Sequence, residues 1–265
     1  MKLLIQEHEA FIYTGGKTFK TSADKPTLVF IHGAQQDHSC WGLQSRYFAH
    51  HGYPVLAPDL PAHGSSQGEP LTSIEALSAW IQAMLTALNV DKAILIGHSM
   101  GSLIALETAL QTPVAIEKVV LIGTSLPMPV SPALLEAAAN NEAQAAALIN
   151  QWSYSARAQL GGSAIPGLWL LGMNQQLMAR QRQGVFAADL NACNNYQREL
   201  DSLKALDKPV LMLAGSLDKM TSPKVLHNIQ QSLPKARLQI LAGAGHALMA
   251  EQPDQVLFAL KHFVA

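Results

Sequence analysis

Residues 93–101 read Ala-Ile-Leu-Ile-Gly-His-Ser-Met-Gly, and this stretch decides the fold. Its first four residues are apolar, which is typical of a strand buried on both faces. The G-x-S-x-G motif that follows predicts a sharp turn into a helix over Ser99–Gln111, with the serine at the apex. A side chain at position 97 or 101 would collide with neighbouring backbone at such a turn, so both positions require glycine. The hydroxyl of Ser99 is then expected to point out above the sheet edge.

Short apolar runs recur along the chain and alternate with helical patterns. The runs are continuous, as expected for strands of a parallel sheet that helices cover on both faces. This alternation predicts an α/β fold with one doubly wound, mostly parallel sheet. Residues 2–14 are predicted to add an antiparallel hairpin at one edge. The clearest strand runs are Leu28–Ile31, Ala93–Ile96, Val119–Ile122 and Val210–Leu213, and the helical segments are Ser73–Asn89, Ser99–Gln111 and Pro223–Leu233.

One long segment, from about residue 127 to residue 200, lacks any strand pattern. It carries helical patterns over 132–152 and 172–183 instead, with glycine and proline pairs between them. Because it follows a predicted strand, we expect it to lie over the carboxyl edge of the sheet as an inserted helical cap. The predicted organisation is a core of residues 1–126 and 201–265 with a cap of residues 127–200.

The composition excludes several classes of protein. The chain has 265 residues, of which 49% are hydrophobic and 14% charged, so it can bury a large core. A net charge of −1 gives no basis for binding nucleic acid or an anionic membrane. No secretion signal or membrane helix is evident, so we expect a cytoplasmic protein without membrane insertion. Neither Cys40 nor Cys193 lies in a metal-ligand spacing, and we expect no metal and no cofactor.

Three residues that follow predicted strands have the chemistry of nucleophilic catalysis. A serine hydroxyl becomes a good nucleophile when a base takes its proton and a third group orients that base. Asp218 follows the run at 209–214, and His246 follows the run at 238–241. Since parallel strands end at one edge of the sheet, we predict that Ser99, His246 and Asp218 converge there as nucleophile, base and orienting carboxylate. Asp59 is the rival acid, and its sequence context favours a structural turn.

The tetrahedral intermediate of such a reaction needs two hydrogen-bond donors for its oxyanion. We expect one to be the backbone N–H of Met100, at the positive start of the helix after Ser99. The other is expected to be the backbone N–H of Ala34, in the loop after His32 and Gly33. The histidines at 32, 63 and 98 are interpreted as buried structural residues.

Apolar residues of the predicted cap are candidates for the substrate pocket. The assignment rests on composition, because no motif marks the pocket. The predicted lining residues are Met128, Trp152, Trp169 and Met173 of the cap, together with Gln35 and Trp41 of the core.

The chain resembles the α/β-hydrolase superfamily over essentially its whole length. The resemblance is carried by Leu28–Ala34, Asp59–Gly64, the elbow at residues 97–101, Gly215–Asp218 and Gly245-His246. Within the superfamily the chain looks like the capped serine esterases and C–C bond hydrolases. The resemblance implies the same catalytic and oxyanion residues that the chemistry suggests. Serine at the nucleophile position disfavours epoxide hydrolases and haloalkane dehalogenases, which have aspartate there.

The predicted function is hydrolysis of small carboxylic esters through an acyl-enzyme on Ser99. One alternative is cleavage of a C–C bond in meta-ring-cleavage products, although His98 and Ala247 stand where such enzymes often have Asn and Trp. The other alternative is a ligand-binding member of the fold with little turnover. The sequence leaves the oligomeric state open.

Overall fold

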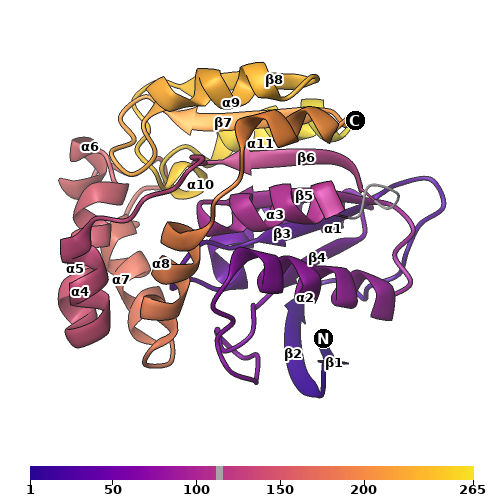
Figure 1. Ribbon diagram of the computed structural model, residues 1–265, viewed down its shortest axis with the longest axis horizontal. Helices are drawn as coiled ribbons and strands as arrows, with labels where there is room; N and C mark the ends of the chain where they lie inside the picture. Colours follow the sequence, from indigo (N-terminus) through magenta and orange to yellow (C-terminus); the bar gives the residue numbers. More distant parts are fainter. Residues whose placement is uncertain (112–115) are drawn as a thin grey trace.

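A central eight-stranded sheet organises the part of the chain that the computed structural model describes, residues 1–111 and 116–265 (Figure 1). The strand order is β1-β2-β4-β3-β5-β6-β7-β8. Pairing is antiparallel between β1 and β2 and between β2 and β4, and parallel between all later neighbours. The strands are β1 (Lys2–Ile5), β2 (His8–Tyr13), β3 (Thr27–Ile31), β4 (Val55–Pro58), β5 (Ala93–His98), β6 (Ile116–Ile122), β7 (Val210–Gly215) and β8 (Ala236–Leu241).

This topology confirms the predicted α/β class and the mostly parallel sheet. The hairpin expected over residues 2–14 is formed by β1 and β2, which lie at one edge of the sheet. The strand that precedes Ser99 is β5, which pairs with β3 and β6 near the middle of the sheet. The turn after β5 is therefore held between two neighbouring strands.

Helices cover both faces of the sheet, which explains why the strand runs are continuously apolar. Alternate residues of β5 belong to two separate cores: Leu95 packs in one, and Ile94 and Ile96 pack in the other. The first core is closed by α2 (Ile74–Ala87), α3 (Met100–Gln111) and α9 (Leu226–Ser232). The second is closed by η1 (His38–Trp41), α1 (Gly42–His50), α10 (Leu248–Glu251) and α11 (Pro253–Val264).

The segment 127–200 folds into helices that gather at one end of the sheet (Figure 1, left). The predicted helix over 132–152 is divided at Asn141, whose side chain caps the second half by accepting from the N–H of Gln144 at 3.2 Å. The sequence patterns did not predict α6 and α8. The elements are α4 (Pro132–Asn140), α5 (Glu142–Ser153), α6 (Ala156–Gln159), α7 (Leu170–Ala179) and α8 (Val185–Asn195), followed by η2 (Leu200–Ala205) and, after β7, η3 (Pro223–Val225).

No helix among the described residues combines the length and the apolar character needed to cross a membrane.

Candidate active site

Ser99 lies in the tight turn between β5 and α3. Its φ of +53° is in the left-handed region, and its N–H donates to the carbonyl of Ile122 at 2.9 Å. A Cβ atom at Gly97 would overlap the carbonyl of Gly101, and one at Gly101 would overlap the carbonyl of Ile31. The geometry confirms that both glycines are steric requirements of this turn.

His246 and Asp218 form a buried pair in the loops after β8 and β7. Nδ1 of His246 lies 2.8 Å from Oδ2 of Asp218, and both residues are buried. The Asp218 carboxylate also accepts from the hydroxyl of Thr221 at 2.8 Å and from two backbone N–H groups, those of Met220 and Thr221. Burial opposes the charged form, but attraction to His246 and these hydrogen bonds outweigh it and lower the pKa of Asp218 to about 2.

Ser99 and His246 line the same cavity, which has a volume of about 210 Å³. The structure thus brings together the three residues that the sequence singled out, from three different loops. His98 lies beside the pair, because its Nε2 donates to the carbonyl of His246 at 3.0 Å. Thr221 and Lys219 also reach this cavity from the loop that carries Asp218.

The two predicted amide donors come from two elements, the start of α3 and the loop after β3. Met100 begins α3, so its N–H belongs to the first turn of that helix, where amide hydrogens have no partner within the helix. Ala34 lines the cavity from the loop after β3. The next amide, that of Gln35, is engaged elsewhere, because it donates to Oδ2 of Asp189 at 2.8 Å.

Comparisons with known proteins agree with this fold. The family model described as the alpha/beta hydrolase family matches residues 28–260. The chain belongs to this family. A candidate esterase/lipase of Haemophilus influenzae is 28% identical over 258 residues, which cover 92% of this chain and 85% of that protein. The sn-1-specific diacylglycerol lipase ABHD11 of Mus musculus is 26% identical over 254 residues, which cover 92% of this chain and 82% of the relative.

A solved structure shares nearly the whole fold of this hydrolase. The enol-lactonase from Burkholderia xenovorans LB400 superimposes with a TM-score of 0.87 over 100% of this chain and 99% of that one, at 20% identity. At this identity the likeness concerns the fold alone.

Two of the residues predicted for the substrate pocket line the cavity of the hydrolase, Met128 and Trp152. Met173 lies instead in a neighbouring groove of about 910 Å³, which shares Gln36 and Asn174 with the cavity. Gln36 follows the motif over residues 28–34, and Asn174 lies in the predicted helical pattern over 172–183, but neither position carries a motif for substrate binding. The sequence therefore gave no signal for them.

The other three predicted lining residues lie outside the cavity. The side chain of Gln35 is buried and donates to the carbonyl of Met178 at 3.3 Å. Trp41 is fully buried in the second core, with its ring 5.4 Å from that of Phe30. Trp169 is 63% exposed. These three predictions are wrong, because composition does not say which way a side chain points.

The structural interpretation of the remaining histidines agrees with their surroundings. His32 is fully buried, with Nδ1 donating to the carbonyl of Gly33 at 2.9 Å and Nε2 accepting from the N–H of Leu60 at 3.1 Å. Burial and the neighbouring His63 lower the pKa of His32 to about 4. Burial and His246 likewise lower the pKa of His98 to about 3. Both rings are therefore neutral near pH 7.

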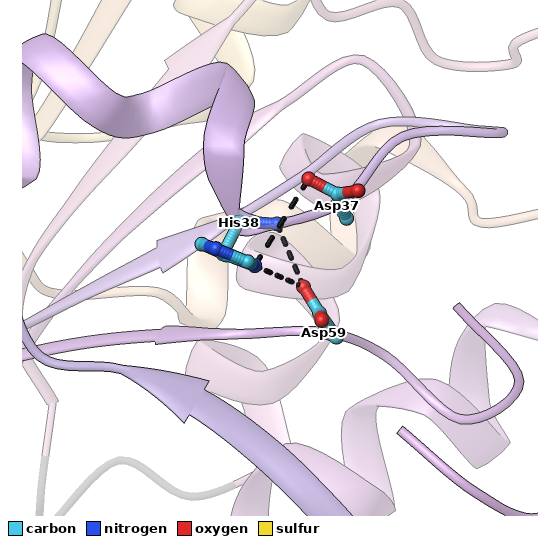
Figure 2. Close-up of side chains that lie close together, drawn as sticks. All are labelled: Asp37, His38 and Asp59. Carbon is cyan, nitrogen blue, oxygen red and sulfur yellow. Dashed lines mark hydrogen bonds and ion pairs between the residues drawn. The ribbon is translucent and has the colours of Figure 1, made fainter. Parts of the chain in front are cut away.

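Asp37, His38 and Asp59 form a second polar cluster, where the end of the loop after β3 meets the turn after β4. Figure 2 shows both carboxylates beside the same edge of the His38 ring. The potential ligand atoms of the three residues lie within 4.8 Å of one another. Asp59 accepts from Nδ1 of His38 at 2.7 Å and from the N–H of Ser65 at 2.8 Å. Asp37 accepts from Arg180 at 2.6 Å. Hydrogen-bond donors of the protein therefore already engage both carboxylates. This favours a structural role, in which Arg180 at the end of α7 holds the loop after β3.

Proposed function

We propose that this hydrolase cleaves small carboxylic esters through an acyl-enzyme on Ser99. The observation that carries the proposal is the cavity shared by Ser99 and His246, with Nδ1 of His246 held 2.8 Å from Asp218. A hydrogen bond from Nδ1–H to a carboxylate leaves Nε2 free to accept a proton.

The reaction follows from these roles. Oγ of Ser99 attacks the ester carbonyl while His246 takes its proton, and the backbone N–H groups of Ala34 and Met100 stabilise the oxyanion. Loss of one such donor typically raises the barrier by about 2.7–4 kcal/mol. His246 then gives the proton to the leaving alcohol. Water, activated by the same ring, attacks the acyl-enzyme, releases the carboxylic acid and restores Ser99.

The substrate class is supported by the cavity walls. Apolar side chains from the segment 127–200 form much of the wall, among them Met128, Trp152 and Phe186. This segment would act as a cap of residues 127–200 on a core of residues 1–126 and 201–265. An apolar cavity of about 210 Å³ fits short acyl or alcohol groups. The relatives named as an esterase/lipase and a diacylglycerol lipase also support ester chemistry.

The test combines turnover with labelling of the serine. A panel of p-nitrophenyl esters and one ring-cleavage diketone is assayed with the wild-type chain and with Ser99→Ala. We expect ester turnover to vanish in the variant while circular dichroism stays unchanged. A fluorophosphonate should label Ser99, and the control Ser65→Ala should retain that label, because Ser65 is exposed and does not line the cavity. Ester turnover by Ser99→Ala, or turnover of the diketone alone, would refute the proposal.

A further inference from the structure

His63 and Asp189 form a fully buried polar pair that joins two distant parts of the chain. His63 lies in the turn after β4, and Asp189 lies on α8. Nε2 of His63 is 2.9 Å from Oδ2 of Asp189, and each side chain is 1% exposed. Nδ1 of His63 is 2.9 Å from the carbonyl of Pro61. A carbonyl can only accept, so Nδ1 carries a proton, and Nε2 then faces the carboxylate with a second proton.

The surroundings of His63 favour this doubly protonated ring. Burial alone would lower the pKa of His63, but attraction to Asp189 and the hydrogen bonds that His63 donates to Asp189 and to the Pro61 carbonyl raise it above the ordinary value. Asp59 adds to the increase, and the ring of His32, 4.8 Å away, is the other titratable group that faces His63. Because His32 keeps its Nδ1 proton and accepts at Nε2, it is neutral and does not repel the imidazolium.

The same carboxylate oxygen reaches the loop that carries the proposed oxyanion donor. Oδ2 of Asp189 accepts from the backbone N–H of Gln35 at 2.8 Å. Gln35 has a φ of +55°, which residues with a side chain rarely adopt. Ala34, the preceding residue, lines the cavity beside Ser99. The bond to Asp189 therefore holds the peptide next to Ala34 in an unfavourable conformation.

We propose that the His63–Asp189 ion pair is a positioning element that fixes the N–H of Ala34 toward the developing oxyanion. The inference rests on the proposed function, since it needs an oxyanion to position. The positive charge of His63 keeps the buried Asp189 carboxylate ionised. That carboxylate holds the loop after β3 in place by accepting a hydrogen bond from the N–H of Gln35. Neither residue touches substrate. An amide donor stabilises an oxyanion only when it lies within hydrogen-bond distance, so a small displacement of the loop reduces turnover.

The kinetic test uses Asp189→Ala and Asp189→Asn, with Arg182→Ala as control. Arg182 also joins the segment 127–200 to the core, through the carbonyls of Ala62 and Gly68, but does not contact the loop at 33–36. We expect Asp189→Ala to lower kcat about 10- to 100-fold with little change in KM. Asp189→Asn covers the case in which the alanine variant does not fold. It should lower kcat at least about threefold, because its amide can accept from Gln35 without balancing the charge of His63.

A second readout separates positioning from a merely structural role. A trifluoromethyl ketone forms a hemiketal oxyanion on the serine, so its affinity should fall in proportion to kcat in both Asp189 variants. Arg182→Ala should keep both quantities within about twofold. The inference is overturned if the Asp189 variants match Arg182→Ala, if KM carries the loss, or if inhibitor affinity does not follow kcat. Loss of turnover in Ser99→Ala, together with full activity in both Asp189 variants, refutes this inference and leaves the proposed function standing.

The ion pair can be observed without any substrate. At pH 6.5 an ordinary imidazole is only half protonated. Proton NMR of the wild-type chain should show both ring N–H protons of His63 at this pH, assigned by their absence in His63→Asn. Asp189→Asn should lose one of them. A ring with a single proton at pH 6.5 in the wild type contradicts the ion pair.

Discussion

The backbone N–H of His246 donates to the carbonyl of Ser153 at 2.7 Å, so the end of α5 holds the loop that carries the imidazole. The N–H of Ala247 donates to the same carbonyl at 3.1 Å. Asp189 holds the loop after β3 through the N–H of Gln35. The segment 127–200 thus hydrogen-bonds to both loops that flank the serine. Its contribution to the site is therefore backbone geometry as well as cavity wall.

Glu251 also joins the segment 127–200 to the loop that carries His246. Its two carboxylate oxygens accept from the N–H of Gly245 at 2.9 Å and from the N–H of Ser155 at 3.1 Å. Glu251→Gln would turn an NH₂ group toward one of these donors and leave it unsatisfied. We expect the free energy of unfolding, measured in urea, to fall by about 1–3 kcal/mol. The exposed Glu75→Gln should change it by less than about 0.5 kcal/mol, and an equal effect of both variants would contradict this role.

Thr221 supports the charge of Asp218. Its hydroxyl donates to Oδ2 of Asp218 at 2.8 Å and lies 3.3 Å from Nδ1 of His246. Thr221→Val keeps the shape but removes this donor, so the pKa of Asp218 should rise from about 2 toward its ordinary value. We expect kcat for a p-nitrophenyl ester to fall about tenfold, which corresponds to about 1.4 kcal/mol. Thr221→Ser should restore most of the activity; if it is as slow as the valine variant, the hydroxyl is not the cause.

The parts of the site that were predictable from sequence are set by local geometry. Ser99 is fixed by the glycines at 97 and 101, and Asp218 and His246 each follow a strand of the same parallel sheet. Strand ends bring residues together without any knowledge of side-chain packing. No such rule applies to the segment 127–200, because the direction of each of its helices depends on tertiary contacts. The contact between His63 and Asp189, 126 positions apart, therefore left no signal in the sequence.

Ala62 has a strained backbone conformation that the sequence did not predict. It lies in the turn over Asp59–Gly64, and its φ is +71°. The left-handed conformation costs a residue with a side chain about 1–2 kcal/mol, whereas glycine costs about 0.4–1 kcal/mol through the unfolded state. Ala62→Gly should therefore raise the free energy of unfolding by about 0.5–1 kcal/mol. Ala83→Gly, within α2, should lower it by about 1 kcal/mol, and two losses of similar size would contradict strain at Ala62.

The buried neutral ring of His98 makes stability depend on pH in acid. Burial and the neighbouring His246 lower its pKa from 6.5 to about 3, so the ring stays neutral in the folded chain while the unfolded chain binds a proton below pH 6.5. The stabilisation is present above pH 6.5 and is lost as the pH falls toward 3. His32, with a pKa lowered to about 4 mainly by burial, acts in the same direction.

The difference between wild type and His98→Asn isolates this contribution. Asparagine keeps a donor for the carbonyl of His246 but takes up no proton. Urea unfolding is measured at several pH values between about 4.5 and 6. We expect the free energy of unfolding to depend less steeply on pH in the variant, by the amount that corresponds to one bound proton. That difference is about 1.4 kcal/mol per pH unit. Parallel curves for the two chains would mean that His98 is protonated in the folded state. Its role as a neutral support beneath the serine turn would then be wrong.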